Sequence, residues 1–290
     1  MNQATKYLAK RIAIVFDFDE TLVPHDSFEL LLRELQIDVD SFISDRVEPL
    51  IADGWDKYLA RAYCLVKYSQ QAEEKEKITK DRLFKIGGKI DLYDRVSEMF
   101  DRLQERAKDI DAEIEIEFYL ISGGFVDIAR GTSIAKHFKR MWGCELHYNE
   151  RGEIDFIKRQ MTHTEKTRYL YYLSKGIEGE NPKDIVYNYR DIPSNEIYIP
   201  LSQTIYVGDG ASDIPCFTVV GDYGGIALGI YPQNSTAPEW DYLPSIQSNQ
   251  RLSNLVPASY EEDSEMMRSL YLAIDCLGKQ IALRKLSIGE

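Results

Sequence analysis

Two aspartates, Asp17 and Asp19, stand two positions apart in the stretch DFDETLV, and Thr21 follows closely. Carboxylates this close repel one another when both are ionised, and a bound divalent cation relieves that repulsion. Such a pair can transfer a phosphoryl group, because one carboxylate attacks phosphorus while the other protonates the leaving oxygen and then activates water. The spacing indicates Asp17 as nucleophile and Asp19 as general acid and base. A turn with helix-capping acids is the alternative.

A second acidic motif, GDGASD, contains Asp209 and Asp213, with glycines that let the backbone approach a ligand closely. Asp209 is a candidate Mg²⁺ ligand, and Asp213 can complete the metal shell directly or through water. We therefore expect Asp17, Asp19, Asp209 and Asp213 around one metal ion. An acidic glycine-rich turn without a ligand is the simpler reading of this motif.

Phosphoryl transfer also needs groups that hold the phosphate. The stretch ISGGF contains Ser122 and Gly123 at the expected start of a helix, where free backbone N–H groups attract phosphate. Thr21 is a further candidate phosphate contact. A cation is needed as well, because one Mg²⁺ cannot balance a phosphate and several carboxylates. Lys166, at an expected helix start, is the candidate for this cation, and Lys158 is its rival.

These motifs must be positioned by strands and helices that alternate along the chain. Apolar runs predict strands at 11–18, 113–124, 203–210 and 224–230, and three of them end in the motifs above. Strands separated by helices predict an α/β fold with a parallel sheet, which collects ligands at the carboxyl ends of its strands. The chemistry is therefore expected at that edge of the sheet.

Helical spacing predicts helices throughout residues 26–90 and at 91–108, 125–140, 163–175 and 261–285. Residues 144–156 are expected to form a hairpin with its turn at 149–152. The segments 176–200 and 231–258 are rich in turn-forming residues and are expected to be loops.

In order, DFDETLV, ISGGF, a lysine and VGDGASDI resemble the motifs of the haloacid dehalogenase superfamily, most closely its phosphoserine-phosphatase-like branch. The resemblance covers most of residues 11–230. It implies a Rossmann-like core from residues 1–24 and 91–290, and an α-helical cap domain inserted at residues 25–90. It further implies a Mg²⁺-dependent phosphatase that forms an aspartyl-phosphate on Asp17 and uses Asp19 as acid and base. The backbone carbonyl of Asp19 is then also expected on the metal.

The substrate is expected to be a small phosphorylated metabolite. In the related branch a glutamate after the first motif reads the substrate amine, and Asp26 stands in its place here. Arg61, in the expected cap, is a candidate to bind a substrate carboxylate. Ser212 precedes Asp213 where the branch often has asparagine. These departures leave phosphoserine open as the substrate. A phosphomutase, a pyrophosphatase or an inactive scaffold protein on the same core are the alternatives.

The composition of the whole chain narrows the remaining classes. Its 290 residues carry a formal net charge of −13, which disfavours a nucleic-acid partner. The start lacks a signal-peptide core and no apolar run is long enough to span a bilayer, so we expect a cytoplasmic protein without membrane partners. The four cysteines lack zinc or CxxC spacing and are expected mainly in the core. His163 is expected to be a surface or core residue, and a homodimer stays open.

Overall fold

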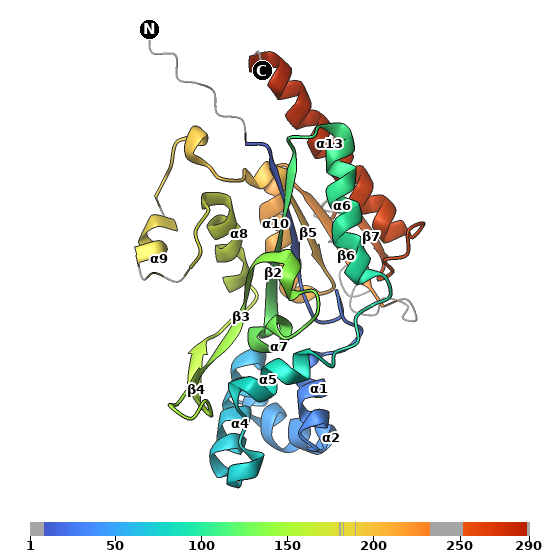
Figure 1. Ribbon diagram of the computed structural model, residues 1–290. Helices are drawn as coiled ribbons and strands as arrows, with labels where there is room; N and C mark the ends of the chain where they lie inside the picture. Colours follow the sequence, from blue (N-terminus) through green and yellow to red (C-terminus); the bar gives the residue numbers. More distant parts are fainter. Residues whose placement is uncertain (1–8, 180, 182, 189, 233–251, 289–290) are drawn as a thin grey trace.

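A computed structural model describes residues 9–288 except 180, 182, 189 and 233–251 (Figure 1). Its centre is a seven-stranded sheet in the order β4-β3-β2-β1-β5-β6-β7. The strands are β1 (Arg11–Phe16), β2 (Glu115–Phe125), β3 (Phe138–Tyr148), β4 (Ile154–Arg159), β5 (Thr204–Gly208), β6 (Ile226–Tyr231) and β7 (Asn254–Pro257). All neighbours pair in parallel except β3 and β4, which form the expected hairpin. The predicted α/β fold is confirmed.

Helices cover both faces of the sheet, so its central strand is apolar on both sides. Along β1, Ile12 and Ile14 belong to a core cluster shared with α6 (Val96–Ile110) and α13 (Glu265–Ile288). Ala13 and Val15 belong to a second cluster, shared with α8 (Glu165–Lys175) and α10 (Ile214–Asp222). Successive side chains of a strand point to opposite faces, which accounts for this alternation. The two clusters pack against both faces of β1 and so fix the position of the DFDET motif that follows it.

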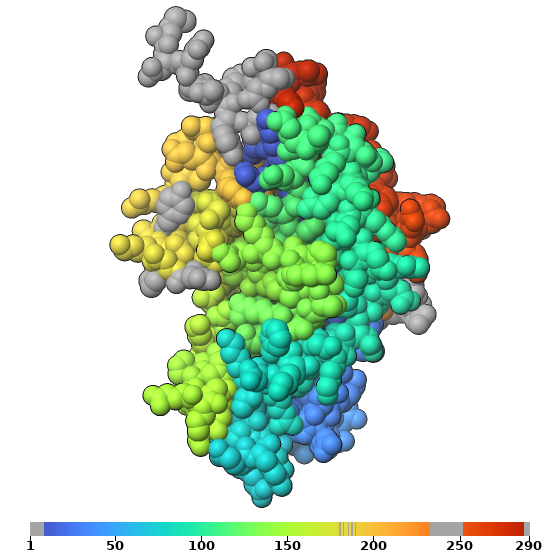
Figure 2. Space-filling view, viewed as in Figure 1, coloured from blue at the N-terminus to red at the C-terminus, as the bar shows by residue number. Residues whose placement is uncertain are grey.

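Five α-helices lie between β1 and α6, and we call them the helical insertion. They are α1 (Ser27–Glu34), α2 (Val39–Phe42), α3 (Glu48–Ala52), α4 (Lys57–Gln71) and α5 (Lys80–Gly87). Aspartates at their N-caps fix where helices begin: the carboxylate of Asp26 accepts from the first turn of α1, and that of Asp56 from the first turn of α4. Figure 2 shows the insertion, blue to cyan, as a lobe at the lower end of the molecule.

Three segments differ from the expected elements. The helix expected at 125–140 is only α7 (Val126–Arg130), because Gly131 ends it and the chain then enters β3, which pairs with β2. The expected loop at 176–200 contains α9 (Lys183–Asn188). The expected loop at 231–258 contains β7, while 233–251 lie outside the described residues. Within the described part of the chain, no helix is both long and apolar enough to cross a bilayer.

Candidate active site

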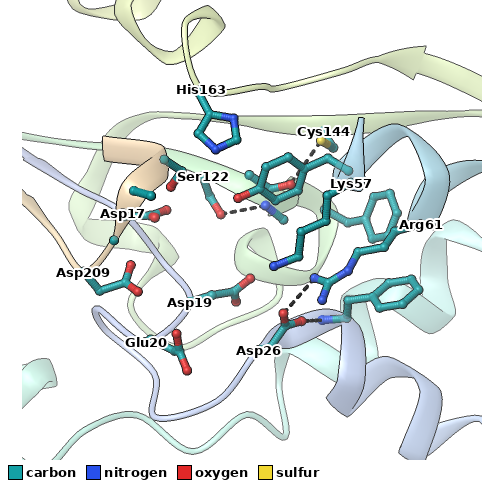
Figure 3. Close-up of a pocket in the computed structure, with 18 residues that line it drawn as sticks. Asp17, Asp19, Glu20, Asp26, Lys57, Arg61, Ser122, Cys144, His163 and Asp209 are labelled. Carbon is teal, nitrogen blue, oxygen red and sulfur yellow. Dashed lines mark hydrogen bonds and ion pairs between the residues drawn. The ribbon is translucent and has the colours of Figure 1, made fainter. Parts of the chain in front are cut away.

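The motif residues meet in a cavity between the carboxyl edge of the sheet and the helical insertion (Figure 3). Asp17 follows β1 directly, and its backbone N–H donates to the carbonyl of Val207 on β5 at 2.9 Å. Asp209 follows β5 in turn. This parallel pairing of β1 with β5 brings together two motifs that are far apart in the sequence.

The carboxylate of Asp17 is buried and accepts two hydrogen bonds. It accepts from the backbone N–H of Phe18 at 2.7 Å and from Lys166 Nζ at 2.8 Å. Lys166 is 1% exposed, and its Nζ also donates to Ser212 Oγ at 3.1 Å and to Asp213 Oδ1 at 2.8 Å. The buried ammonium therefore joins the first and last motifs.

Lys158, the rival cation, lies elsewhere. It is on β4, and its Nζ pairs with Glu145 at 3.6 Å, with 59% of its side chain exposed. Of the two candidate lysines, only Lys166 reaches Asp17.

Three carboxylates, those of Asp17, Asp209 and Asp213, offer oxygens that lie within 4.8 Å of one another. Asp213 Oδ2 is buried and has no hydrogen-bond partner among the described residues. Burial, reinforced by repulsion from Asp17 and Asp213, raises the pKa of Asp209 well above its usual range. A hard divalent cation with oxygen ligands would satisfy the orphaned oxygen and offset the repulsion, so these residues fit Mg²⁺.

Asp19 faces the same cavity but keeps its carboxylate out of that cluster. Its Oδ1 accepts from the backbone N–H of Ser27 at 3.0 Å, and its Oδ2 accepts from Ser27 Oγ at 3.0 Å. Burial, followed by repulsion from Asp26 and Asp17, raises the pKa of Asp19 well above its ordinary value. A carboxyl with a raised pKa can carry a proton near neutral pH and donate it.

Ser122 and Gly123 line the cavity, but they lie within β2 and not at a helix start as expected. Ser122 is buried, and its Oγ accepts from the backbone N–H of Gly124 at 3.0 Å. Thr21 is also buried, and its hydroxyl donates to Asp209 Oδ1 at 3.4 Å. This bond orients a candidate metal ligand, while a phosphate contact by Thr21 stays a prediction.

The two candidate substrate residues form an ion pair on the cavity wall. Arg61 Nη1 lies 2.7 Å from Asp26 Oδ2, and the guanidinium stacks over the ring of Phe28 at 4.9 Å. Asp26 also caps α1, so this pair ties α1 to α4.

The cavity is also lined by residues that the sequence did not indicate as site residues. Lys57 and Tyr58 precede Arg61 by one helical turn on α4, and that spacing was a usable signal once Arg61 was a candidate. Ser212 contacts Lys166, as described above. His163, expected as an ordinary surface or core residue, lines the cavity with its ring 6.1 Å from that of Tyr58.

Comparisons with known proteins agree with this fold. No protein-family model matches the chain. An uncharacterised protein of Borreliella burgdorferi is 27% identical over 233 residues, which cover 73% of this chain and 79% of that protein. A HAD-family hydrolase from Salmonella enterica serovar Typhi superposes with a TM-score of 0.59 at 14% identity, covering 92% of this chain and 72% of that one.

A substrate-bound phosphoserine phosphatase gives a TM-score of 0.54 at 15% identity, covering 90% of this chain and 98% of that one. A probable phosphoserine phosphatase from Vibrio cholerae gives 0.55 at 13% identity, covering 96% and 69%. The Rossmann-like core that the motif resemblance implied is therefore confirmed, and the chain shares its fold with these solved structures.

Proposed function

We propose that the protein is a Mg²⁺-dependent phosphatase that hydrolyses a small phosphomonoester through an aspartyl-phosphate on Asp17. The observation that supports this most is the direct contact of the buried Lys166 with Asp17 beside two further carboxylates. A carboxylate nucleophile next to a fixed cation suits attack on a phosphoryl group.

In the proposed reaction an Asp17 oxygen attacks phosphorus in line with the ester oxygen, and the P–O bond to the leaving group breaks. Protonated Asp19 gives its proton to that oxygen. Ionised Asp19 then takes a proton from water, the water oxygen bonds to phosphorus, and the bond to Asp17 breaks. Lys166, Ser122 and the N–H group of Gly123 hold the phosphoryl oxygens.

Asp17, Asp209 and Asp213 would hold Mg²⁺, with the backbone carbonyl of Asp19 as a further ligand. When bound, the ion supplies positive charge that offsets the carboxylates and polarises the phosphoryl group. The orphaned Oδ2 of Asp213 supports this assignment.

We further propose residues 25–90 as a cap domain that closes over a core made of residues 1–24 and 91–290. The cavity volume of about 190 Å³ supports a small metabolite as substrate. Asp26 would bind an amine of this substrate and Arg61 a carboxylate, and the ion pair of the two residues on the cavity wall supports these roles. Phosphoserine is one candidate, and scattered unpaired cysteines support a reducing cytoplasm.

Phosphate release from a panel of phosphorylated metabolites tests the proposal, with Mg²⁺ or with EDTA. We expect metal-dependent release that Asp17→Asn abolishes and that Asp40→Asn, at an exposed position, leaves intact. Release without metal, or release that survives Asp17→Asn in a clean preparation, would contradict the mechanism. No release from any compound would favour the scaffold alternative.

A further inference from the structure

A second cavity lies at the edge of the sheet, and we call it the edge groove. Its volume is about 650 Å³, and its lining comes from α7, β3, β4 and the segment after α8. It shares no lining residue with the cavity that contains Asp17. The β3–β4 hairpin and α8 lie on the same side of the molecule (Figure 1). The proposed phosphatase reaction uses none of its residues.

The edge groove exists because β4 covers only part of β3. The two strands pair from Glu145 to Tyr148, so the first half of β3 has no strand on that side. Five consecutive residues, from Phe138 to Trp142, line the groove. Trp142 is 4% exposed and stacks on Tyr119, with ring centroids 5.8 Å apart and planes at 3°. The apolar residues of the lining are Phe138, Met141 and Trp142, and we call them the apolar wall.

The charge of the edge groove is opposite to that of the chain. Two acids line it, Glu145 and Glu178, in a protein of net charge −13. The five cations on its lining come from three elements and are Arg130, Lys139, Arg140, Lys158 and Arg159. Two acids outside the lining pair with two of these cations: Asp127 lies 3.0 Å from Arg130, and Glu117 lies 2.6 Å from Lys139.

When these four acids are counted against the five cations, a formal excess of one positive charge remains. Glu145 faces three cations, Arg130 at 3.1 Å, Lys158 at 3.6 Å and Arg159 at 3.9 Å. One carboxylate balances one of them, and the two longer distances exceed normal hydrogen-bond length. Arg140 pairs with Glu178. Arg159 Nη2 also donates to the carbonyl of Gly179 at 3.4 Å, so Lys158 Nζ and the other nitrogens of Arg159 are the donors that can turn to a ligand.

We propose that the edge groove binds a small polyanion with adjacent phosphate groups on an apolar or aromatic body, such as a nucleoside diphosphate. Guanidinium and ammonium groups on two neighbouring positions suit phosphate oxygens, which guanidinium binds in bidentate fashion. The apolar wall would take the organic body. The volume lies within the range of small-molecule sites, about 300–1,000 Å³.

An acidic peptide added to the edge of β3 would use the same charges, but the observations favour the small ligand. Three of the five cations converge on Glu145 at one end of the groove. A second copy of this chain would be repelled, because lysine and arginine on an edge strand oppose self-pairing.

Calorimetric titration of the metal-free, full-length Asp17→Asn protein with ADP and with pyrophosphate tests the proposal. This background removes the proposed nucleophile and prevents turnover of the probes, and the groove variants separate binding in the groove from binding in the active-site cavity. We expect both probes to bind, ADP more tightly, and more weakly as salt screens the charges. Lys158→Gln combined with Arg159→Gln should weaken ADP binding at least about tenfold, since charged hydrogen bonds are lost.

Lys108→Gln, at an exposed position on α6, is the matched control and should not change the affinity. Because Lys158 is largely exposed, Lys158→Gln alone keeps the fold and should give an intermediate loss. No binding, or binding that the groove variants leave unchanged, would overturn the proposal. Binding of an acidic peptide in place of both probes would assign the groove to a protein partner. Since no turnover is measured, the result is independent of the proposed phosphatase function.

Discussion

At the scale of single residues, the role of Asp19 as proton donor is the part of the proposed mechanism that a single substitution tests most directly. Asp19→Asn keeps the shape of the side chain but cannot carry the proton, so both reaction steps should slow. We expect a loss of about 10² to 10⁴-fold, the usual contribution of general acid–base catalysis. Rapid-quench measurement of aspartyl-phosphate formation and decay resolves the two steps. A wild-type rate for either step would refute the double role of Asp19.

The hydrogen bond from Ser27 Oγ to Asp19 can be removed by a substitution that leaves Asp19 itself in place. This bond stabilises the ionised carboxylate and so lowers the pKa of Asp19 against the raising effect of burial. Ser27→Ala should therefore move the alkaline limb of the pH–rate profile upward, because Asp19 stays protonated to higher pH. A downward shift would contradict this environment for Asp19.

Tyr58 extends the polar contacts of the site into the helical insertion. Its hydroxyl bonds to Ser212, which in turn accepts from Lys166, and its ring lies where a Cβ at Gly123 would approach to 2.6 Å. Tyr58→Phe removes only the hydroxyl and should lower kcat by about tenfold, the cost of one bond near a charged group. Tyr58→Ala should also raise KM. An unchanged kcat in Tyr58→Phe would limit the residue to packing.

The sequence predicts the aspartates of the site better than it predicts the other residues that line the cavity. Asp17 and Asp209 each follow a strand of one parallel sheet, and such strand ends meet at one edge, so their proximity follows from local patterns. Tyr58 reaches the cavity, and meets the ring of His163, only through the way the helical insertion docks on the core. That docking depends on packing between distant segments, which no local spacing reports.

At the scale of elements, α5 and α7 approach one another through glycines. A Cβ at Gly87 would lie 1.9 Å from the carbonyl oxygen of Ile128, and one at Gly131 would lie 2.0 Å from that of Phe84. Gly131→Ala should destabilise the protein by about 1–3 kcal/mol, because backbone must move. Gly221→Ala in α10 meets no atom within 4 Å and should be neutral or stabilising. Equal urea midpoints for both variants would contradict this close approach.

The same region shows why element boundaries were hard to predict. The segment 125–140 begins with a helical pattern, and α7 follows it until Gly131. The sequence predicts that its later residues continue the helix, yet from Phe138 they pair with β2. Basic residues such as Lys139 and Arg140 suit a helix surface as well as an edge strand. Pairing with β2 makes this segment a strand and not a helix, and a single sequence contains no direct signal of that pairing.

At the scale of the whole molecule, burying the carboxylates of the active site costs stability without a metal. Asp17 has an ordinary pKa of 3.8, and burial raises it to about 7 in the fold. Between these values the folded state binds more protons than the unfolded state, so stability falls as pH rises through that window. Mg²⁺ binds the ionised carboxylates, so its stabilising effect should grow over the same range.

Thermal unfolding with EDTA or with Mg²⁺, from about pH 5 to about pH 8, measures this linkage directly. We expect the Tm of the metal-free protein to fall with rising pH and the Tm gain from Mg²⁺ to increase. Asp17→Asn should flatten the metal-free profile, because asparagine does not titrate, while Asp40→Asn should not. A Tm gain from Mg²⁺ that is largest at the lowest pH would mean that the ion does not bind this carboxylate cluster. That conclusion would hold even if the protein were an active phosphatase.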